Sequence, residues 1–178
     1  HTARVNCVTF SPDGKLLATG SVDSTAKIWN VVSGKMLRTL KGHTNVVNSV
    51  AFSPNGNLLA TCSNDNTAKI WDIISGKTLL TCRDHTRINC VAFSLDGKLL
   101  ATVSGGRYEG VKTYGKPSLI TFEINNVKIW DISSGKLLLT LHDHTESVNS
   151  VVFSPDRKLL ATGSSDNSAK IWDLQTGT

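Results

Sequence analysis

Three segments of the chain carry a histidine, a threonine, an aspartate and a tryptophan in the same order and at matching spacing. A hydroxyl, an imidazole and a carboxylate are the groups of a hydrolase triad, in which the imidazole accepts the proton of the attacking hydroxyl. A fourth set keeps only the histidine, the threonine and the tryptophan. The sets are His1, Thr19, Asp23, Trp29; His43, Thr61, Asp65, Trp71; His144, Thr162, Asp166, Trp172; and the incomplete His85, Thr102, Trp130.

Repetition of the set favours a structural role over catalysis. An active site is normally formed once in a chain, and no G-x-S-x-G nucleophile turn is present. A buried imidazole, indole and hydroxyl each need a hydrogen-bond partner, and a connected chain of four groups satisfies them together. We therefore expect no catalytic residue. In the incomplete set, Asn125 or Asn126 is the candidate replacement for the aspartate.

Metal and cofactor binding are not expected either. The repeated histidines lie 42 or more residues apart, and no C-x-x-C pair is present. The cysteines occupy positions where other copies of the repeat have serine, glycine or leucine, which predicts free, mostly buried thiols in a reducing compartment. They are Cys7, Cys62, Cys82 and Cys90. This favours the cytoplasm, with the nucleus as the alternative in a eukaryotic cell.

A long repeat must position these residues. Trp29, Trp71, Trp130 and Trp172 are separated by 42, 59 and 42 residues, and each ends a phrase such as FSPDGKLLATGSVDSTAKIWN. An 18-residue insertion and a one-residue deletion explain the longer spacing. In the first copy, 5–10, 16–21, 25–30 and 36–40 predict four short strands separated by turns that contain Gly, Asp, Ser or Pro.

The phrases G-H, F-S-P-D-G, L-A-T-G-S, the D-x-T/S turn and K-I-W-D resemble the WD40-repeat family over nearly the whole chain. The resemblance implies an all-β fold, a fragment of a β-propeller with four blades that are four-stranded antiparallel sheets. It also implies that each set of polar residues is a structural hydrogen-bond network. We expect one WD40 repeat region, 1–178, with blades at about 1–41, 42–83, 84–142 and 143–178.

The last blade is expected to lack its outer strand, giving 15 strands in place of 16. The chain starts without methionine, and we expect a fragment of a larger protein. An open arc would expose two apolar faces, so the expected partners include the remaining blades of the parent chain or a second copy of this chain.

One insertion, 105–126, interrupts the third copy, and its segment 118–124 is predicted to form a strand or a hairpin. Tyrosine and arginine are frequent in binding hot spots. The candidate partner-binding residues are Arg107, Tyr108, Lys112, Tyr114, Lys116 and Phe122. The alternative is a tolerated surface insertion without a function.

The formal net charge is +5, but many lysines fall at one fixed position of the repeat, and no basic cluster or nucleic-acid-binding motif is present. Nucleic-acid binding is therefore not favoured, and no apolar stretch is long enough for a membrane helix. The main hypothesis is a scaffold for an unidentified protein partner. The alternative is the sensor region of a multidomain signalling protein of the nucleotide-driven switch ATPase type, with catalysis elsewhere, because no G-x-x-x-x-G-K-[ST] occurs here.

Overall fold

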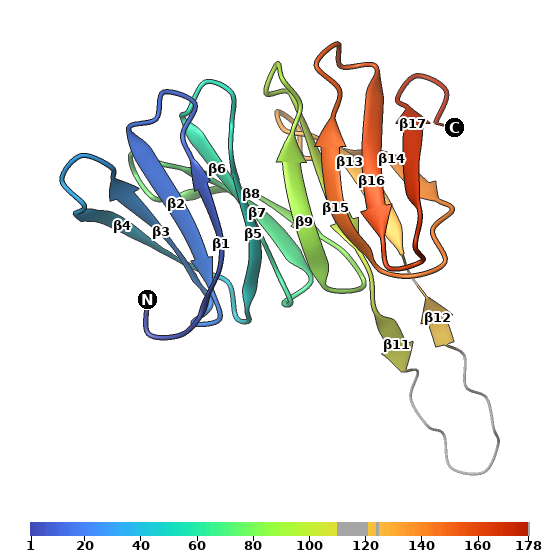
Figure 1. Cartoon of the computed structure of the whole chain (residues 1–178), viewed down its shortest axis with the longest axis horizontal. Helices are drawn as coiled ribbons and strands as arrows, with labels where there is room; N and C mark the ends of the chain where they lie inside the picture. Colours follow the sequence, from blue (N-terminus) through green and yellow to red (C-terminus); the bar gives the residue numbers. More distant parts are fainter. Residues whose placement is uncertain (110–120, 124, 178) are drawn as a thin grey trace.

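A computed structural model describes residues 1–109, 121–123 and 125–177. The fold is all-β, and the described residues contain no helix. Four antiparallel sheets stand side by side in chain order and form an open arc (Figure 1). This confirms the fold class expected from the sequence.

Each sheet is one blade, and its strands pair in chain order. Blade one consists of β1 (Val5–Phe10), β2 (Leu16–Ser21), β3 (Thr25–Asn30) and β4 (Met36–Lys41). Blade two consists of β5 (Val47–Phe52), β6 (Leu58–Ser63), β7 (Thr67–Asp72) and β8 (Thr78–Arg83). Blade three consists of β9 (Ile88–Phe93), β10 (Leu99–Ser104), β13 (Asn126–Asp131) and β14 (Leu137–His142). Blade four has three strands, β15 (Val148–Phe153), β16 (Leu159–Ser164) and β17 (Ala169–Asp173).

The turn between the first two strands of a blade follows from its sequence. In blade one, Ser11 Oγ donates a hydrogen bond of 2.6 Å to Asp13 Oδ1 and accepts one of 2.9 Å from the amide of Leu16. Gly14 has a φ of 71°, a conformation that costs glycine little. Blade four has Arg157 at the equivalent position with a φ of 65°, so a side chain occupies the left-handed region there.

The apolar core lies between the blades. Val47, Val50 and Phe52 on β5 pack against Ala18 and Ile28 of blade one. Two similar clusters join blade two to blade three and blade three to blade four. Each sheet is therefore covered by its neighbours, which ties the position of one blade to the next.

The insertion adds a small hairpin, β11 (Arg107–Glu109) paired with β12 (Thr121–Glu123). Together with the 15 strands of the blades it gives 17 strands in the described residues. The hairpin extends away from blade three at the lower edge of the arc in Figure 1. That is the edge at which the second strand of each blade ends and its third strand begins.

Candidate functional site

The His–Thr–Asp–Trp set of blade two is a connected chain of hydrogen bonds, which we call a quartet. Trp71 Nε1 donates to Thr61 Oγ1 at 2.8 Å, and Thr61 Oγ1 lies 2.7 Å from His43 Nε2. His43 Nδ1 lies 2.8 Å from Asp65 Oδ2. The quartet joins strands β6 and β7 to the loop before β5 and to the turn that carries Asp65.

The aspartate at the end of the chain is held by its own turn. Asp65 Oδ1 accepts hydrogen bonds from the amide of Thr67 at 2.9 Å and from its hydroxyl at 2.6 Å. Burial raises the pKa of Asp65, but hydrogen bonds from Thr67, Thr44 and His43 outweigh burial and hold this pKa below its ordinary value. An ionised Asp65 fixes the Nδ1–H tautomer of His43, so that Nε2 accepts the proton of the Thr61 hydroxyl.

Burial lowers the pKa of His43 below its ordinary value, although the nearby Asp65 opposes this shift. The imidazole is therefore neutral at pH 7, as the hydrogen bond to Thr61 requires. Every donor and acceptor of the chain is used inside the protein, which is the condition for burying it at low cost.

Blades one and four repeat the same geometry. In blade one, His1 lies 2.7 Å from Thr19 and 2.8 Å from Asp23, and Trp29 donates to Thr19 at 2.9 Å. In blade four, His144 lies 2.8 Å from Thr162 and 2.7 Å from Asp166, and Trp172 donates to Thr162 at 2.9 Å. The structure therefore brings together all members of these two expected sets.

Blade three differs from the expectation. Trp130 still donates to Thr102 at 3.0 Å, but the side chain of His85 is exposed. Within the described residues, no hydrogen bond links His85 to Thr102, Asn125 or Asn126. Neither asparagine replaces the missing aspartate, although both are buried. The physical reason is the lost turn: without a carboxylate to hold Nδ1, nothing offsets the cost of burying the imidazole.

The residue before the histidine is buried instead. Asp84 has a side chain that is 1% exposed, and its Oδ1 lies 2.8 Å from Lys128 Nζ on β13. In blade four the equivalent pair, Asp143 and Lys170, lies nearer the surface. Asp84 Oδ2 and Thr86 Oγ1 have no hydrogen-bond partner among the described residues. Blade three thus exchanges a satisfied polar chain for a buried ion pair.

The quartets resemble a hydrolase triad in geometry, but their hydroxyl groups are not accessible to a substrate. The Thr61 side chain is fully buried, and its oxygen accepts a hydrogen bond from Trp71, so its lone pairs do not face a substrate. The indole ring of Trp71 packs in the cluster between blades one and two. The chain of hydrogen bonds therefore orients an aromatic ring that fills the space between two sheets.

A second set of polar residues was missed by the sequence reasoning. An asparagine is the second residue in the first strand of blades one, two and three. Its side chain donates a hydrogen bond to a backbone carbonyl oxygen of the next blade, at the first residue of that blade's first strand. These residues are Asn6, Asn48 and Asn89. The bonds are Asn6 to Val47 at 3.2 Å, Asn48 to Ile88 at 2.8 Å and Asn89 to Val148 at 2.8 Å. We call them bridging asparagines. Their signal was an asparagine after valine or isoleucine in every copy of the repeat.

The candidate partner-binding residues all come from the insertion. Arg107 and Tyr108 lie on β11 and Phe122 lies on β12, whereas Lys112, Tyr114 and Lys116 lie outside the described residues. The start of the insertion is fixed, because Arg87 Nε donates to the carbonyl oxygen of Gly105 at 2.9 Å. A Cβ on Gly105 would lie 2.4 Å from the Cα of Ser147 in the loop before blade four.

The four cysteines are free. Cys62 and Cys82 are buried, and Cys7 and Cys90 are half-buried. Burial raises the pKa of Cys7 and of Cys82 to about 11, which keeps both thiols protonated. In the described part of the chain, no three acidic, cysteine or histidine side chains gather as metal ligands, and no helix is long and apolar enough to cross a membrane.

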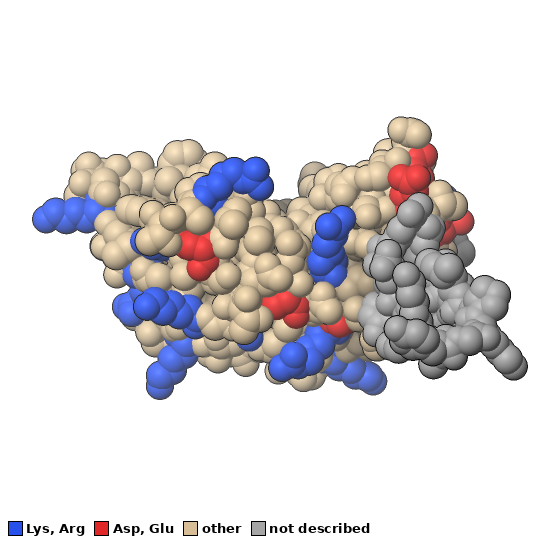
Figure 2. Space-filling view, turned by 90° about the horizontal axis from the view of Figure 1, so that it is seen from below, with Lys and Arg blue, Asp and Glu red and all other residues tan. Residues whose placement is uncertain are grey.

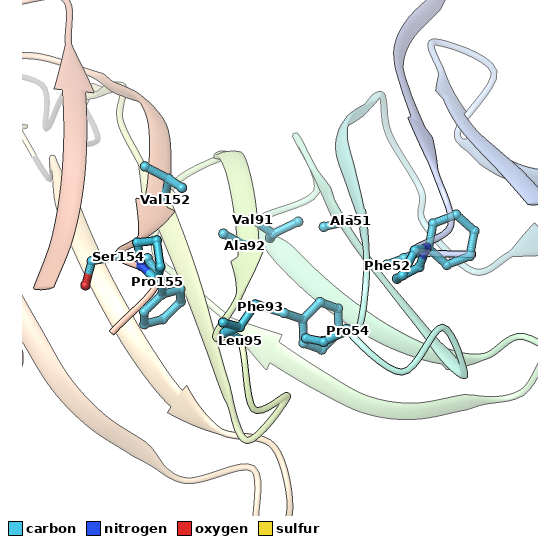
Figure 3. A pocket seen from close by; sticks show the side chains of 12 residues that line it. Ala51, Phe52, Pro54, Val91, Ala92, Phe93, Leu95, Val152, Ser154 and Pro155 are labelled. Atoms are coloured by element: carbon cyan, nitrogen blue, oxygen red, sulfur yellow. The ribbon is translucent and has the colours of Figure 1, made fainter. Parts of the chain in front are cut away.

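A shallow apolar groove of about 490 Å³ crosses the inner side of the arc. Its lining comes from the first strands of blades two, three and four, from the turns that follow them and from Pro12 in the first turn of blade one, and Figure 3 shows the side chains. Phe93, Pro54, Leu95 and Val152 are among its lining residues. Its walls offer apolar contact and no ionisable group, so the groove itself provides no means of acid–base chemistry.

Charge is spread over the edge of the arc that bears the hairpin. Figure 2 shows this edge, where Lys and Arg side chains are separated by uncharged and acidic ones. Lys128 and Lys170 are paired with aspartates. A continuous basic track of the kind that follows a phosphate backbone is not visible on this face.

Comparison with known proteins agrees with this architecture. A sequence profile of the WD domain, G-beta repeat, matches residues 1–30, 34–72, 76–107 and 135–173. The chain belongs to the WD-repeat family. Residues 108–134 fall outside the match, and they hold most of the insertion and strand β13. Repeats of this family generally form non-catalytic scaffolds for protein interactions.

Several relatives resemble the chain. Periodic tryptophan protein 2 of Arabidopsis thaliana is 33% identical over 194 residues, which cover 98% of this chain and 18% of that protein. Nuclear distribution protein nudF of Aspergillus flavus is 34% identical over 178 residues, which cover 99% of this chain and 27% of that protein. WD repeat and SOCS box-containing protein 1 of Homo sapiens is 47% identical over 60 residues, or 32% of this chain and 14% of that protein. The chain spans less than a third of the length of each of these three relatives.

Proposed function

We propose that the chain is a non-catalytic scaffold that binds a protein partner at the edge of the arc from which hairpin β11–β12 extends. The observation that carries this proposal is the contrast between quartet and insertion. The quartets contain the groups suited to catalysis, but these groups are hydrogen-bonded to one another and stabilise the blades. The insertion lies outside the four blades, and its described strand β11, which contains Arg107 and Tyr108, extends from one edge of the arc (Figure 1).

The first residue of the insertion is held in place by the blades, which supports a role of the insertion in binding a partner. Its first residue, Gly105, is hydrogen-bonded to Arg87 and lies against Ser147 of the next blade. A loop that starts from a fixed point loses less conformational entropy on binding than a free one. The quartet aspartates and histidines lie along the same edge and hold the neighbouring loops. We propose the cytoplasm as the location, or the nucleus in a eukaryotic cell, because four free thiols suit a reducing compartment.

The proposal is tested by shortening the insertion. Replacing residues 105–125 with the sequence of residues 64–66 gives blade three the short turn of blade two. We expect this variant, and the double variant Tyr108→Ala with Tyr114→Ala, to fold but to lose the partners that the parent chain captures. The measurement is quantitative mass spectrometry of proteins cross-linked to each variant in cells, with circular dichroism as the folding control.

A matched control is Val32→Ser, which alters an exposed apolar residue in the turn between β3 and β4. It should leave the set of captured proteins unchanged. If the short-turn variant recovers the same proteins in the same amounts as the parent chain, the insertion is a tolerated surface loop and the proposed binding edge is wrong.

A further inference from the structure

The connection from the end of β8 to β9 turns alternate side chains outward and inward. Arg83, His85 and Arg87 are exposed, and we call these three residues the outward row. Between them, Asp84 has a side chain that is 1% exposed, and Thr86 is buried. The connection joins two complete blades and lies at the same edge of the arc as hairpin β11–β12. The outward row is therefore part of the surface of that edge.

The arginines of the outward row are not neutralised by a carboxylate of the described residues. The one acidic residue between them, Asp84, is bound in the interior, with its Oδ1 2.8 Å from Lys128 Nζ. Neither Arg83 nor Arg87 forms an ion pair within the described part of the chain. The buried ion pair of blade three thus has an effect outside the core, because it leaves two guanidinium groups available at the surface.

The equivalent connections before blades two and four lack this row. His85 lies three residues before the start of β9, whereas His43 and His144 lie four residues before β5 and β15. The connection before blade three is therefore one residue shorter, and its histidine does not reach the buried position of the other two. The connection before blade four is acidic, because it contains Asp143 and Glu146. A shorter connection with an arginine at each end is specific to blade three.

The outward row is held by hydrogen bonds on both sides. The amide of Asp84 donates to the carbonyl oxygen of Asn66 in blade two at 2.9 Å, and the amide of His85 donates to Asp84 Oδ1 at 2.6 Å. Arg87 Nε donates to the carbonyl oxygen of Gly105 at 2.9 Å, and the amide of Gly105 donates back to the carbonyl oxygen of Arg87 at 3.4 Å. A fixed connection loses less conformational entropy when its side chains bind a partner.

We propose that the outward row binds an acidic segment of the protein partner, an extended stretch with Asp or Glu side chains. The proposal rests on the proposed scaffold function and adds the chemistry of the segment that is bound. A guanidinium group binds a carboxylate through two parallel hydrogen bonds, and clusters of arginine are typical of sites for acidic motifs. Four residues of extended chain span at most about 14 Å. A segment of about five residues is therefore long enough to reach both Arg83 and Arg87.

The test is fluorescence anisotropy of the whole chain with a fluorescein-labelled heptapeptide in which three glutamates alternate with serines. We expect Arg83→Gln with Arg87→Gln to raise the Kd by about 10-fold or more, because two charge-assisted contacts are lost. His85→Glu places a carboxylate between the arginines and should abolish binding. The matched control, Lys15→Gln with Lys35→Gln, removes the same charge from exposed turns at the opposite edge. It should change the Kd by less than about twofold.

Three outcomes of this measurement would overturn the proposal. The first is equal binding of a heptapeptide with glutamine in place of glutamate, since the row would then not recognise charge. The second is tighter binding of a short oligothymidylate with three phosphates, which would make nucleic acid the better ligand. The third is the same rise in Kd for the lysine control as for the arginine variant. Circular dichroism must show folded β-structure for every variant, which separates loss of binding from loss of fold.

Capture of partners in cells separates this proposal from the proposed role of the insertion. If the arginine double variant captures the same proteins as the parent chain while the short-turn variant loses them, the insertion binds the partner and the acidic-segment proposal is wrong. If the arginine double variant loses the partners while the short-turn variant keeps them, the outward row binds the partner and the proposed role of the insertion is wrong.

Discussion

Blade two and blade three start from almost the same repeat and reach different solutions for their buried polar groups. In blade two the aspartate turn holds His43, and the imidazole, hydroxyl and indole form one satisfied chain. In blade three the insertion removes that turn, His85 turns to solvent, and the preceding Asp84 is buried against Lys128. A single turn therefore decides whether the histidine belongs to the core.

The largest effect is expected at the ion pair of blade three. Asp84→Ala leaves the buried ammonium of Lys128 without a partner and should lower the free energy of unfolding by about 3–5 kcal/mol. The control is the double variant Asp84→Leu with Lys128→Met, which removes both charges and should fall much nearer to the parent chain. Urea unfolding followed by tryptophan fluorescence measures both. Equal losses in the single and double variants would show that the charge pairing is unimportant.

The next largest effect is expected when the histidine of blade two and the histidine of blade three are each replaced by alanine. His43→Ala removes the centre of a buried quartet and takes one hydrogen-bond partner from Thr61 and one from Asp65, which should lower the free energy of unfolding by about 1–3 kcal/mol. His85→Ala alters an exposed side chain and should change it by less than about 0.5 kcal/mol. Thermal and urea unfolding of both variants check this. Similar values for the two variants would mean that the quartet does not distinguish the blades.

The free energy of unfolding should depend on pH through the titration of His43 and Asp65 in the quartet of blade two. The folded-state pKa of His43 is lowered, so the unfolded chain binds more protons as the pH falls below the ordinary histidine pKa of about 6.5. The stability from this group is present above that pH and is lost as the pH falls toward the folded-state pKa. The lowered pKa of Asp65 acts in the same direction at a lower pH, below about 4.

Melting temperatures between pH 7 and pH 5 measure the histidine part of this dependence. The slope should be smaller in His43→Gln than in the parent chain, and it should be unchanged in Val32→Ser, which alters an exposed residue without a titratable group. An unchanged slope in His43→Gln would contradict the assignment of the pH dependence to the buried quartet.

The smallest effect concerns the turn of blade four. Arg157 has a positive φ where the other blades have glycine, and this conformation costs a side chain about 1 kcal/mol. Arg157→Gly removes that strain but also removes an exposed ion pair with Asp96, which contributes little. We expect a gain in stability of at most about 1 kcal/mol by urea unfolding. The control, Asp96→Asn, removes the ion pair and keeps the strain, and it should give no gain.

Much of the fold could be predicted from the sequence because the same repeat occurs four times in the chain. The strands of blade one match the expected residues to within one position, since the turns at Ser11–Gly14 and Asp23–Thr25 are set by local chemistry. The hairpin in the insertion agrees with the β-rich segment seen at 118–124, although only 121–123 of it are described in β12.

The site was predicted less completely, for two physical reasons. In the other blades the histidine is held by an aspartate 22 residues later in the sequence, and blade three lacks this aspartate. The order of histidine, threonine and tryptophan in blade three is the same as in the other blades, so it did not reveal that His85 is exposed. The bridging asparagines act between blades, and the recurrence of an asparagine after valine or isoleucine in each copy does not identify its acceptor in the next copy. The partner residues Lys112, Tyr114 and Lys116 lie outside the described residues, and their role stays a prediction.

The placement of apolar clusters between sheets has a consequence for how the array unfolds. Each cluster is shared by two neighbouring sheets, and blades two and three each take part in two of the three clusters. Opening of one sheet should therefore uncover its neighbour, and the amide hydrogens of blades two and three should exchange slowly. Each sheet added by tandem duplication contributes one more cluster, so cooperativity grows with the number of repeats.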